Sequence, residues 1–134
     1  MYLVDTSAWI EVFRRPPRLA IEDVVEFDEI VTCLPVVQEV LQGFVEERDF
    51  RVAREAMLAL PMVESPLDQR VLLEAADLFR AARRAGRPVR SGVDCVIAAC
   101  AIRHGLTVLH NDRDYPALAG VSPLQHRQLP RASA

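Results

Sequence analysis

Apolar runs of strand length alternate along the chain with apolar positions at helical spacing. In chain order the predicted elements are a strand at residues 2–4, helices at 8–13 and 19–27, a strand at 30–34, helices at 35–44, 49–60, 68–85 and 93–104, and strands at 106–109 and near 121–124. Prolines and glycines, such as Pro35 and Gly105, stand where these helices begin or end. The alternation is typical of an α/β fold in which a mainly parallel sheet is covered by helices on both faces.

Length and composition indicate one domain. The chain has 134 residues, of which 51% are hydrophobic and 26% charged, and this is enough apolar surface for one core. We expect this domain to span residues 1–130 and the tail at 131–134 to be disordered. The first residues lack a basic segment, and no apolar run approaches the roughly 20 residues of a membrane span. We therefore expect a cytoplasmic protein with no signal peptide and no membrane segment.

The residue types present exclude several kinds of site. All 16 basic residues are arginines, which excludes a Schiff-base lysine and a phosphate loop of the Walker A type. The five glycines never reach the spacing of a dinucleotide fingerprint or a nucleophile elbow. Cys33, Cys95 and Cys100 form no CxxC pair and lie in apolar stretches, so we expect small buried thiols rather than a zinc site or a disulfide framework.

Five acidic residues stand where sites form in parallel sheets, outside the carboxyl ends of the strands. Asp5 directly follows the first predicted strand, and Asp112 and Asp114 follow the third. Asp94 lies in the first turn of a predicted helix, and Glu39 lies in an otherwise apolar helix. Each acid by itself also has an ordinary explanation as a helix cap, a turn residue or a solvated side chain. The joint pattern favours a shared site.

A cluster of carboxylates is unfavourable unless cations neutralise the repulsion between them. Ligand sets made only of oxygen suit hard ions such as Mg²⁺ or Mn²⁺. Such ions activate water and stabilise the oxygens of a phosphate, so the pattern predicts metal-dependent hydrolysis of phosphodiester bonds. Because the net charge is −3, a nucleic acid would need a local arginine surface or bound cations for binding.

Arginines and a histidine near these acids are the next candidates. Arg90 lies four residues before Asp94, and Arg113 stands between two of the acids, so both are candidate contacts to an RNA backbone. A solvated position at a helix end is the alternative for these arginines and for the others near residue 85. His110 lies two residues before Asp112 and could assist catalysis, although the acidic pattern requires no histidine.

Four segments carry these acids in a fixed order. They are VDTSAWI at residues 4–10, VQEVLQG at 37–43, DCVIAACA at 94–101 and NDRDY at 111–115. In order, spacing and total length the chain resembles the PIN domain family, and within it the VapC-type ribonuclease toxins of bacterial toxin–antitoxin pairs. The resemblance implies a three-layer α/β/α fold with a mainly parallel sheet of four or five strands. It also implies a Mg²⁺-dependent endoribonuclease.

The resemblance further implies roles for single acids. Asp5, Glu39, Asp94 and Asp112 match the acidic quartet of the family, with Asp5 and Asp94 as the firmest metal ligands. Either Asp112 or Asp114 completes the metal site, and the sequence does not choose between these two residues. Glu39 either binds the metal through water or helps to orient the attacking water.

Other positions of the motifs carry further expectations. Thr6 or Ser7 matches the small hydroxyl residue beside the first aspartate, and it contacts a phosphate or a metal-bound water or only caps the helix. Tyr115 replaces the usual phenylalanine at the end of the last motif and keeps the ring, so we expect little change. Besides the RNA substrate, the resemblance implies a small antitoxin that covers the site and a homodimer.

Three other functions compete with a ribonuclease. A PIN-like module without catalysis would act as a scaffold or regulator, but it would have no need of a cluster of unneutralised carboxylates. A phosphatase or phosphotransferase would want a second aspartate two residues after Asp5, where the chain has Ser7, and a lysine elsewhere. A DNA-directed flap nuclease shares the acidic chemistry but normally needs a longer chain. The choice of RNA over DNA rests on the resemblance alone.

Overall fold

The computed structural model describes residues 1–130, and the tail predicted at 131–134 lies outside the described residues. Four short strands form one sheet in the order β2-β1-β3-β4, and every neighbouring pair is parallel. They are β1 (Tyr2–Val4), β2 (Ile30–Val31), β3 (Thr107–His110) and β4 (Gln125–Gln128). The prediction of a parallel sheet of four or five strands is confirmed, with four.

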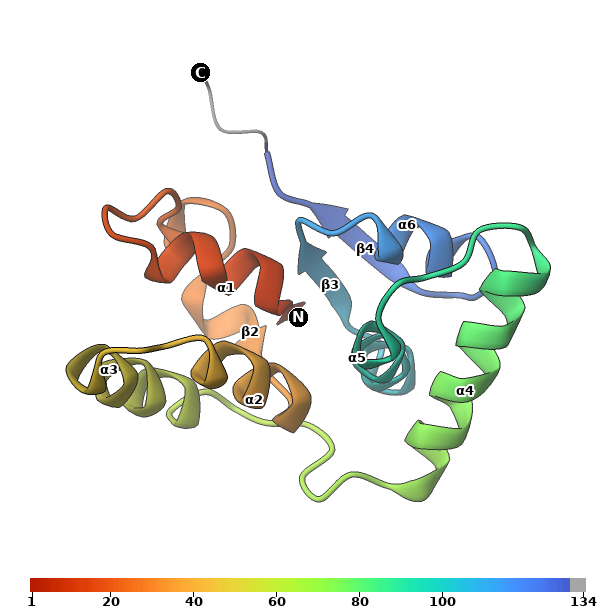
Figure 1. Ribbon diagram of the computed structural model, residues 1–134, viewed down its shortest axis with the longest axis horizontal. Coiled ribbons are helices and arrows are strands. Elements are labelled where there is room, and N and C mark those ends of the chain that lie inside the picture. The colour runs from red at the N-terminus through yellow and green to blue at the C-terminus, as the bar shows by residue number, and fades with distance from the viewer. Residues whose placement is uncertain (131–134) are drawn as a thin grey trace.

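In the described residues 1–130, six α-helices accompany the sheet. They are α1 (Thr6–Phe13), α2 (Leu34–Gln42), α3 (Glu47–Leu58), α4 (Gln69–Arg84), α5 (Gly92–His104) and α6 (Asp114–Ala119). Figure 1 shows α1, α2 and α3 as one group and α4, α5 and α6 as another, with strands of the sheet between them. The predicted α/β class is confirmed. Within residues 1–130, no helix combines the length and the apolar composition that a membrane crossing requires.

The register of β1 and β3 brings distant loops to one edge of the sheet. Leu3 lies opposite Val108, and the backbone N–H of Asp5 donates to the carbonyl oxygen of Leu109 over 2.9 Å. Because the two strands run in the same direction, the segments that follow them leave the sheet side by side. Helices α2 and α5, which carry Glu39 and Asp94, also contact each other.

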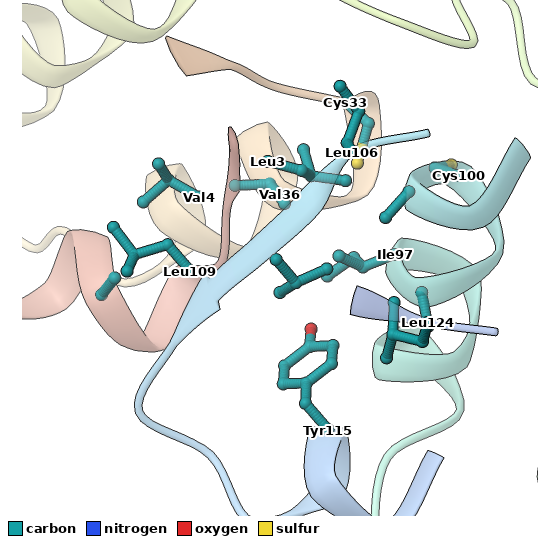
Figure 2. Packing of buried hydrophobic residues seen from close by; sticks show 14 of the residues in the cluster. Leu3, Val4, Cys33, Val36, Ile97, Cys100, Leu106, Leu109, Tyr115 and Leu124 are labelled. Atoms are coloured by element: carbon teal, nitrogen blue, oxygen red, sulfur yellow. The ribbon is translucent and has the colours of Figure 1, made fainter. Parts of the chain in front are cut away.

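The core is built around β1, β3 and α5. Leu3 and Leu109 are fully buried, and Ile97 of α5 lies beside these strands (Figure 2). Helix α5 has buried residues on most of its faces. Asp94, in the first turn of the helix, is one of these buried residues. The three cysteines Cys33, Cys95 and Cys100 are buried and free, as the sequence predicted. An acid in such a helix is removed from water by the fold and not by its own sequence neighbours.

The helix predicted at residues 19–27 is wrong. The chain there forms two short 3₁₀ turns, Ile21–Asp23 and Phe27–Glu29. The core receives Ile21 and Val25 from this segment, while most of its other residues are acidic or exposed. Two buried positions four residues apart are too few for an apolar stripe that would hold a continuous helix.

The strand predicted at residues 30–34 is shorter than expected. Only Ile30–Val31 pairs with β1. Thr32 instead forms a single parallel bridge with Met62, and Leu34 already belongs to α2. The apolar composition of the segment continues past the strand because Cys33, just before the next helix, is also buried in the core, whereas Leu34 at the start of that helix is exposed.

The last two elements also differ from the prediction. The strand expected near residues 121–124 lies instead at β4, which is polar and mostly exposed as an edge strand. Because an edge strand of this kind lacks alternating apolar residues, its sequence gives no strand signal. The polar turn predicted at residues 111–114 leads into the short helix α6, which accepts Pro116 in its first turn.

Candidate active site

Acidic side chains from four segments converge at the carboxyl edge of the sheet. Asp5 follows β1, Glu39 lies in α2, Asp94 lies in α5 and Asp112 follows β3. One carboxylate oxygen each of Asp5, Glu39 and Asp94 lie within 4.8 Å of one another, and the same holds for Asp94, Asp112 and Asp114. Asp94 belongs to both groups. The structure therefore brings the five predicted acids into one cluster.

Three donors hold the carboxylate of Asp5. Its Oδ2 accepts from the backbone N–H of Ser7 at 3.0 Å and from the Ser7 hydroxyl at 2.6 Å. Its Oδ1 accepts from the hydroxyl of Tyr115 at 2.5 Å. Asp5 is thus the N-cap of α1 and a member of the acidic cluster at once. The Ser7 hydroxyl also accepts from the N–H of Asn111 at 2.8 Å, which ties the loop after β3 to the start of α1.

Asp94 is the acid with the least support from the protein. Only 4% of its surface is exposed, and its Oδ2 has no hydrogen-bond partner among residues 1–130. Burial, and then the negative charges of Asp5 and Asp112, raise the pKa of Asp94 to about 9. A buried carboxylate oxygen without a partner is unfavourable unless a cation approaches it. This atom identifies where in the cluster positive charge is missing.

Glu39 faces the same cluster from α2. Its Oε1 accepts a hydrogen bond from the hydroxyl of Thr6 at 2.9 Å. Burial raises the pKa of Glu39, the bond from Thr6 opposes this, and the charges of Asp5 and Asp112 raise it further. Thr6 and Ser7 therefore serve two different acids, Thr6 the glutamate and Ser7 the first aspartate.

The structure separates the surroundings of Asp112 and Asp114. The carboxylate of Asp114 is buried and accepts from the backbone N–H groups of Arg90, at 3.1 and 3.2 Å, and Ser91, at 3.2 Å. The side chain of Asp112 is 24% exposed, and its Oδ1 accepts from the N–H of Asp114 at 2.9 Å. Asp114 is thus an anchor for the loop before α5, while Asp112 keeps part of its carboxylate in contact with solvent.

The two predicted arginines lie differently. The guanidinium of Arg90 is near both acids of the last motif, with Nη2 3.7 Å from Asp112 Oδ1 and Nε 3.9 Å from Asp114 Oδ1. Its side chain is 60% exposed, so these ion pairs are weak. Arg113 is exposed at the start of α6, and no ion pair holds it within the described part of the chain. Only Arg90 is brought into contact with the acids.

His110 has a larger structural part than its sequence position indicated. It is fully buried, and its Nδ1 accepts from the N–H of Asp112 at 3.1 Å. In the tautomer that this bond assigns, Nε2 carries the hydrogen and donates it to Nδ1 of His126 at 2.9 Å. Burial, and then the charge of His126, lower the pKa of His110 to about 4. A neutral His110 therefore supports the loop that carries Asp112. A histidine at the end of an apolar strand was the only signal for this in the sequence.

The donor set of the cluster fits a divalent cation. Every candidate ligand is a carboxylate oxygen, which is the chemistry that Mg²⁺ and Mn²⁺ prefer. The unpartnered oxygen of Asp94 lies among the charges of Asp5 and Asp112, where a cation would satisfy it and reduce the repulsion. The residues present therefore fit a metal-dependent site.

Comparison with known families now decides the classification. The family model described as PIN domain matches residues 2–121. The chain belongs to the PIN domain family. The predicted resemblance to this family is therefore confirmed.

This PIN domain is similar to curated VapC proteins. Ribonuclease VapC11 of Mycobacterium tuberculosis is 39% identical over 132 residues, which cover 93% of this chain and 96% of that protein. Ribonuclease VapC51 of the same species is 30% identical over 122 residues, which cover 90% of this chain and 87% of that protein. Among solved structures, a chain of VapBC2 from Rickettsia felis bound to a promoter DNA fragment has a TM-score of 0.76 and 14% identity, with 96% of this chain and 98% of that chain covered. This last likeness concerns the fold.

Proposed function

We propose that this PIN domain is an endoribonuclease of the VapC type, the toxin of a toxin–antitoxin pair. The observation that carries the proposal is the unpartnered buried oxygen of Asp94 at the centre of a carboxylate cluster. The relatives named as VapC ribonucleases support it, because they align with this chain over nearly their whole length. The protein contributes to the reaction mainly by placing acids around one point.

Asp5, Asp94 and Asp112 would hold the metal, which is Mg²⁺ with Mn²⁺ as a substitute. When bound, such an ion lowers the pKa of a water and stabilises charge on a phosphate. Asp114 keeps the loop before α5 in place through two backbone N–H groups and thereby brings Asp94 to the cluster. We therefore assign the last metal-ligand position to Asp112. Asp114 then has a structural role, because it holds the loop before α5.

Glu39 would orient and deprotonate the attacking water. Its pKa is raised by burial, which makes it a stronger base than an exposed glutamate. The hydroxyl of Thr6 fixes the orientation of its carboxylate, and the hydroxyl of Ser7 does the same for Asp5. Both hydroxyl residues thus act on acids of the site and lie at the edge where a phosphate would enter.

Arg113 and Arg90 would contact the RNA backbone. Arg113 is exposed and follows Asp112 directly in the sequence, and Arg90, whose side chain is 60% exposed, lies 3.7 Å from the carboxylate of Asp112. One guanidinium group can donate two parallel hydrogen bonds to two oxygens of a phosphate. Two arginines near the acids would therefore guide a phosphate toward the acidic cluster. Substrate charge is thereby met by local arginines although the chain as a whole is acidic.

The partners follow from the same assignment. We propose that a cognate antitoxin covers the acidic cluster, that the toxin forms a homodimer and that residues 1–130 make up its one domain. A cytoplasmic location goes with this function, because the RNA that such an enzyme cleaves lies in the cytoplasm.

A cleavage assay tests the proposed function. The purified chain, free of antitoxin, is incubated with a pool of tRNA and rRNA in Mg²⁺ or in EDTA, beside Asp94→Asn and the exposed helix variant Asp77→Asn. We expect discrete fragments from the wild type and Asp77→Asn in Mg²⁺ only, and a loss of at least 100-fold in rate for Asp94→Asn. Bound metal without cleavage would favour a catalytically silent binding module. Cleavage that survives EDTA would contradict the metal site.

A further inference from the structure

Tyr115 stands behind the acidic cluster and reaches it through its hydroxyl. The residue lies at the start of α6 and is fully buried. Figure 2 shows its ring in the core near Ile97, with the hydroxyl directed to the interior. The ring also packs against His110, with 4.8 Å between the ring centroids. The hydroxyl lies 2.5 Å from Oδ1 of Asp5, a residue 110 positions away in the sequence.

The direction of this hydrogen bond is fixed by the charge state of the phenol. A phenol ordinarily ionises only at about pH 10, and a carboxylate oxygen accepts, so the hydroxyl of Tyr115 donates a hydrogen bond to the carboxylate of Asp5 around neutral pH. Hydrogen bonds from a hydroxyl to an ionised oxygen are short and strong, in agreement with the distance.

The donors around Asp5 leave little of its carboxylate free. An ionised carboxylate has about four acceptor positions, two on each oxygen. Ser7 occupies both positions on Oδ2 with its backbone N–H and its hydroxyl, and Tyr115 occupies one on Oδ1. One acceptor position on Oδ1 therefore remains free. Asp5 directly follows β1, which ends at Val4. The arrangement restricts Asp5 to a single orientation.

We propose that Tyr115 is a positioning residue that fixes the carboxylate of Asp5, so that one acceptor position of Oδ1 is presented to the divalent cation. The inference rests on the proposed function, because it treats Asp5 as a metal ligand. It departs from the expectation that a tyrosine in place of phenylalanine changes little. A phenylalanine ring would fill the same space in the core, but it would leave Oδ1 without its donor, so that only the two bonds from Ser7 to Oδ2 would orient the carboxylate.

Metal binding by Tyr115→Phe tests this role directly. The variant removes one hydroxyl and keeps the ring, and Tyr2→Phe is the matched control because Tyr2 is the other tyrosine of the chain and lies at the opposite end of β1. Free Mn²⁺ is counted by electron paramagnetic resonance during a titration of each protein. We expect Tyr115→Phe to weaken the affinity for Mn²⁺ by about 10-fold, the usual effect of removing a hydrogen-bond partner from a metal ligand. Tyr2→Phe should bind as the wild type does.

Kinetics separates positioning from a general loss of structure. The Mg²⁺ concentration that gives half-maximal RNA cleavage should rise in Tyr115→Phe, while the maximal rate at saturating Mg²⁺ stays within a few-fold of the wild type. A purely structural role would instead lower the thermal midpoint in EDTA and leave the Mn²⁺ affinity of the folded protein unchanged. Equal affinity in Tyr115→Phe and Tyr2→Phe would overturn the proposal.

A measurement without the Tyr115→Phe variant keeps the test open if that variant does not fold. In Tyr2→Phe, Tyr115 is the only tyrosine, so the tyrosine bands of a near-ultraviolet difference spectrum, read apart from the longer-wavelength band of Trp9, report on its hydroxyl. Binding of Mg²⁺ at Asp5 should shift the tyrosine band, because the acceptor of the hydroxyl loses electron density. Metal binding with no tyrosine shift overturns the role of Tyr115 only. A wild type that binds no Mn²⁺ overturns both this role and the proposed metal site.

Discussion

Asp94 is a buried acid whose ionised form is unfavourable in the metal-free protein, and the proposed metal site depends on it. The residue lies in an apolar helix, and one of its oxygens has no partner among residues 1–130. Burial and the charges of Asp5 and Asp112 both oppose its ionisation. A divalent cation would reverse both effects, since it neutralises the field and accepts the free lone pair. The same carboxylate therefore destabilises the metal-free protein and favours metal binding.

The free energy of unfolding of the metal-free protein should fall as the pH rises. The pKa of Asp94 is about 9 in the folded chain and 3.8 ordinarily, so between these values the folded state holds a proton that the unfolded chain has released. The stability contributed by this group is complete below about pH 4 and is lost as the pH rises through about 9. Thermal unfolding in EDTA should give a smaller decrease for Asp94→Asn than for the wild type across this range. Parallel curves would show that Asp94 is not the group responsible.

At the scale of elements, the site depends on a connection between α6 and the start of α5. Asp114, the first residue of α6, accepts from the backbone N–H groups of Arg90 and Ser91 just before α5. These bonds give a protein acceptor to backbone N–H groups that have no partner within the helix at its start. They also fix where Asp94 enters the cluster. Two acids two residues apart, Asp112 and Asp114, thus have different tasks.

Substitution of these two acids should separate metal binding from stability. Asp114→Asn replaces a charged acceptor of two backbone N–H groups, and we expect a loss of about 1–3 kcal/mol in the free energy of unfolding. Asp112→Asn keeps an amide oxygen for the N–H of Asp114, so its stability should change less, while its Mn²⁺ affinity should fall at least 10-fold. Urea unfolding in EDTA and Mn²⁺ titration check both. The reverse ranking would exchange the roles of the two residues.

At the scale of the whole molecule, the charges are unevenly distributed. The net charge is −3, and acids gather around a hollow at the start of β1, lined by Glu22, Asp23, Glu26 and Glu29. Arg90 and Arg113 lie instead at the other end of the sheet, beside the acidic cluster. Because local potential and not net charge directs a polyanion, RNA should approach from the side of these arginines once a bound cation neutralises the acids of the cluster.

The salt dependence of RNA binding should report this arrangement. Binding of a single-stranded RNA is measured by fluorescence anisotropy at several salt concentrations, in the Asp94→Asn background to prevent cleavage. Arg113→Gln should reduce the slope of log affinity against log salt by about 0.7, the value for one lost phosphate contact on a single strand. Arg54→Gln on α3, an exposed position away from the cluster, is the control and should keep the slope. Identical slopes for the two variants would remove Arg113 from the RNA surface.

Long elements could be predicted because their signals are local. The helix predicted at 68–85 is observed at Gln69–Arg84, and Asp68 caps it with a bond to the N–H of Arg70 at 2.8 Å. The helix predicted at 93–104 begins one residue earlier and ends before Gly105, whose φ of 64° suits glycine. The predictions for residues 19–27 and for the polar strand β4 were wrong. The conformation of such short segments depends on the residues that pack against them in space and not on a periodic pattern in their own sequence.

The sequence by itself determined the α/β class, the family and the five acids of the cluster, because strand ends, helix starts and motif spacing are properties of neighbouring residues. Tertiary structure alone decided how those acids are held. Tyr115 reaches Asp5 across 110 positions of sequence, and Asp114 anchors the loop that carries Arg90. Such contacts depend on the parallel register of β1 and β3, and a hydrogen bond forms only when the fold brings its donor and acceptor to bonding distance.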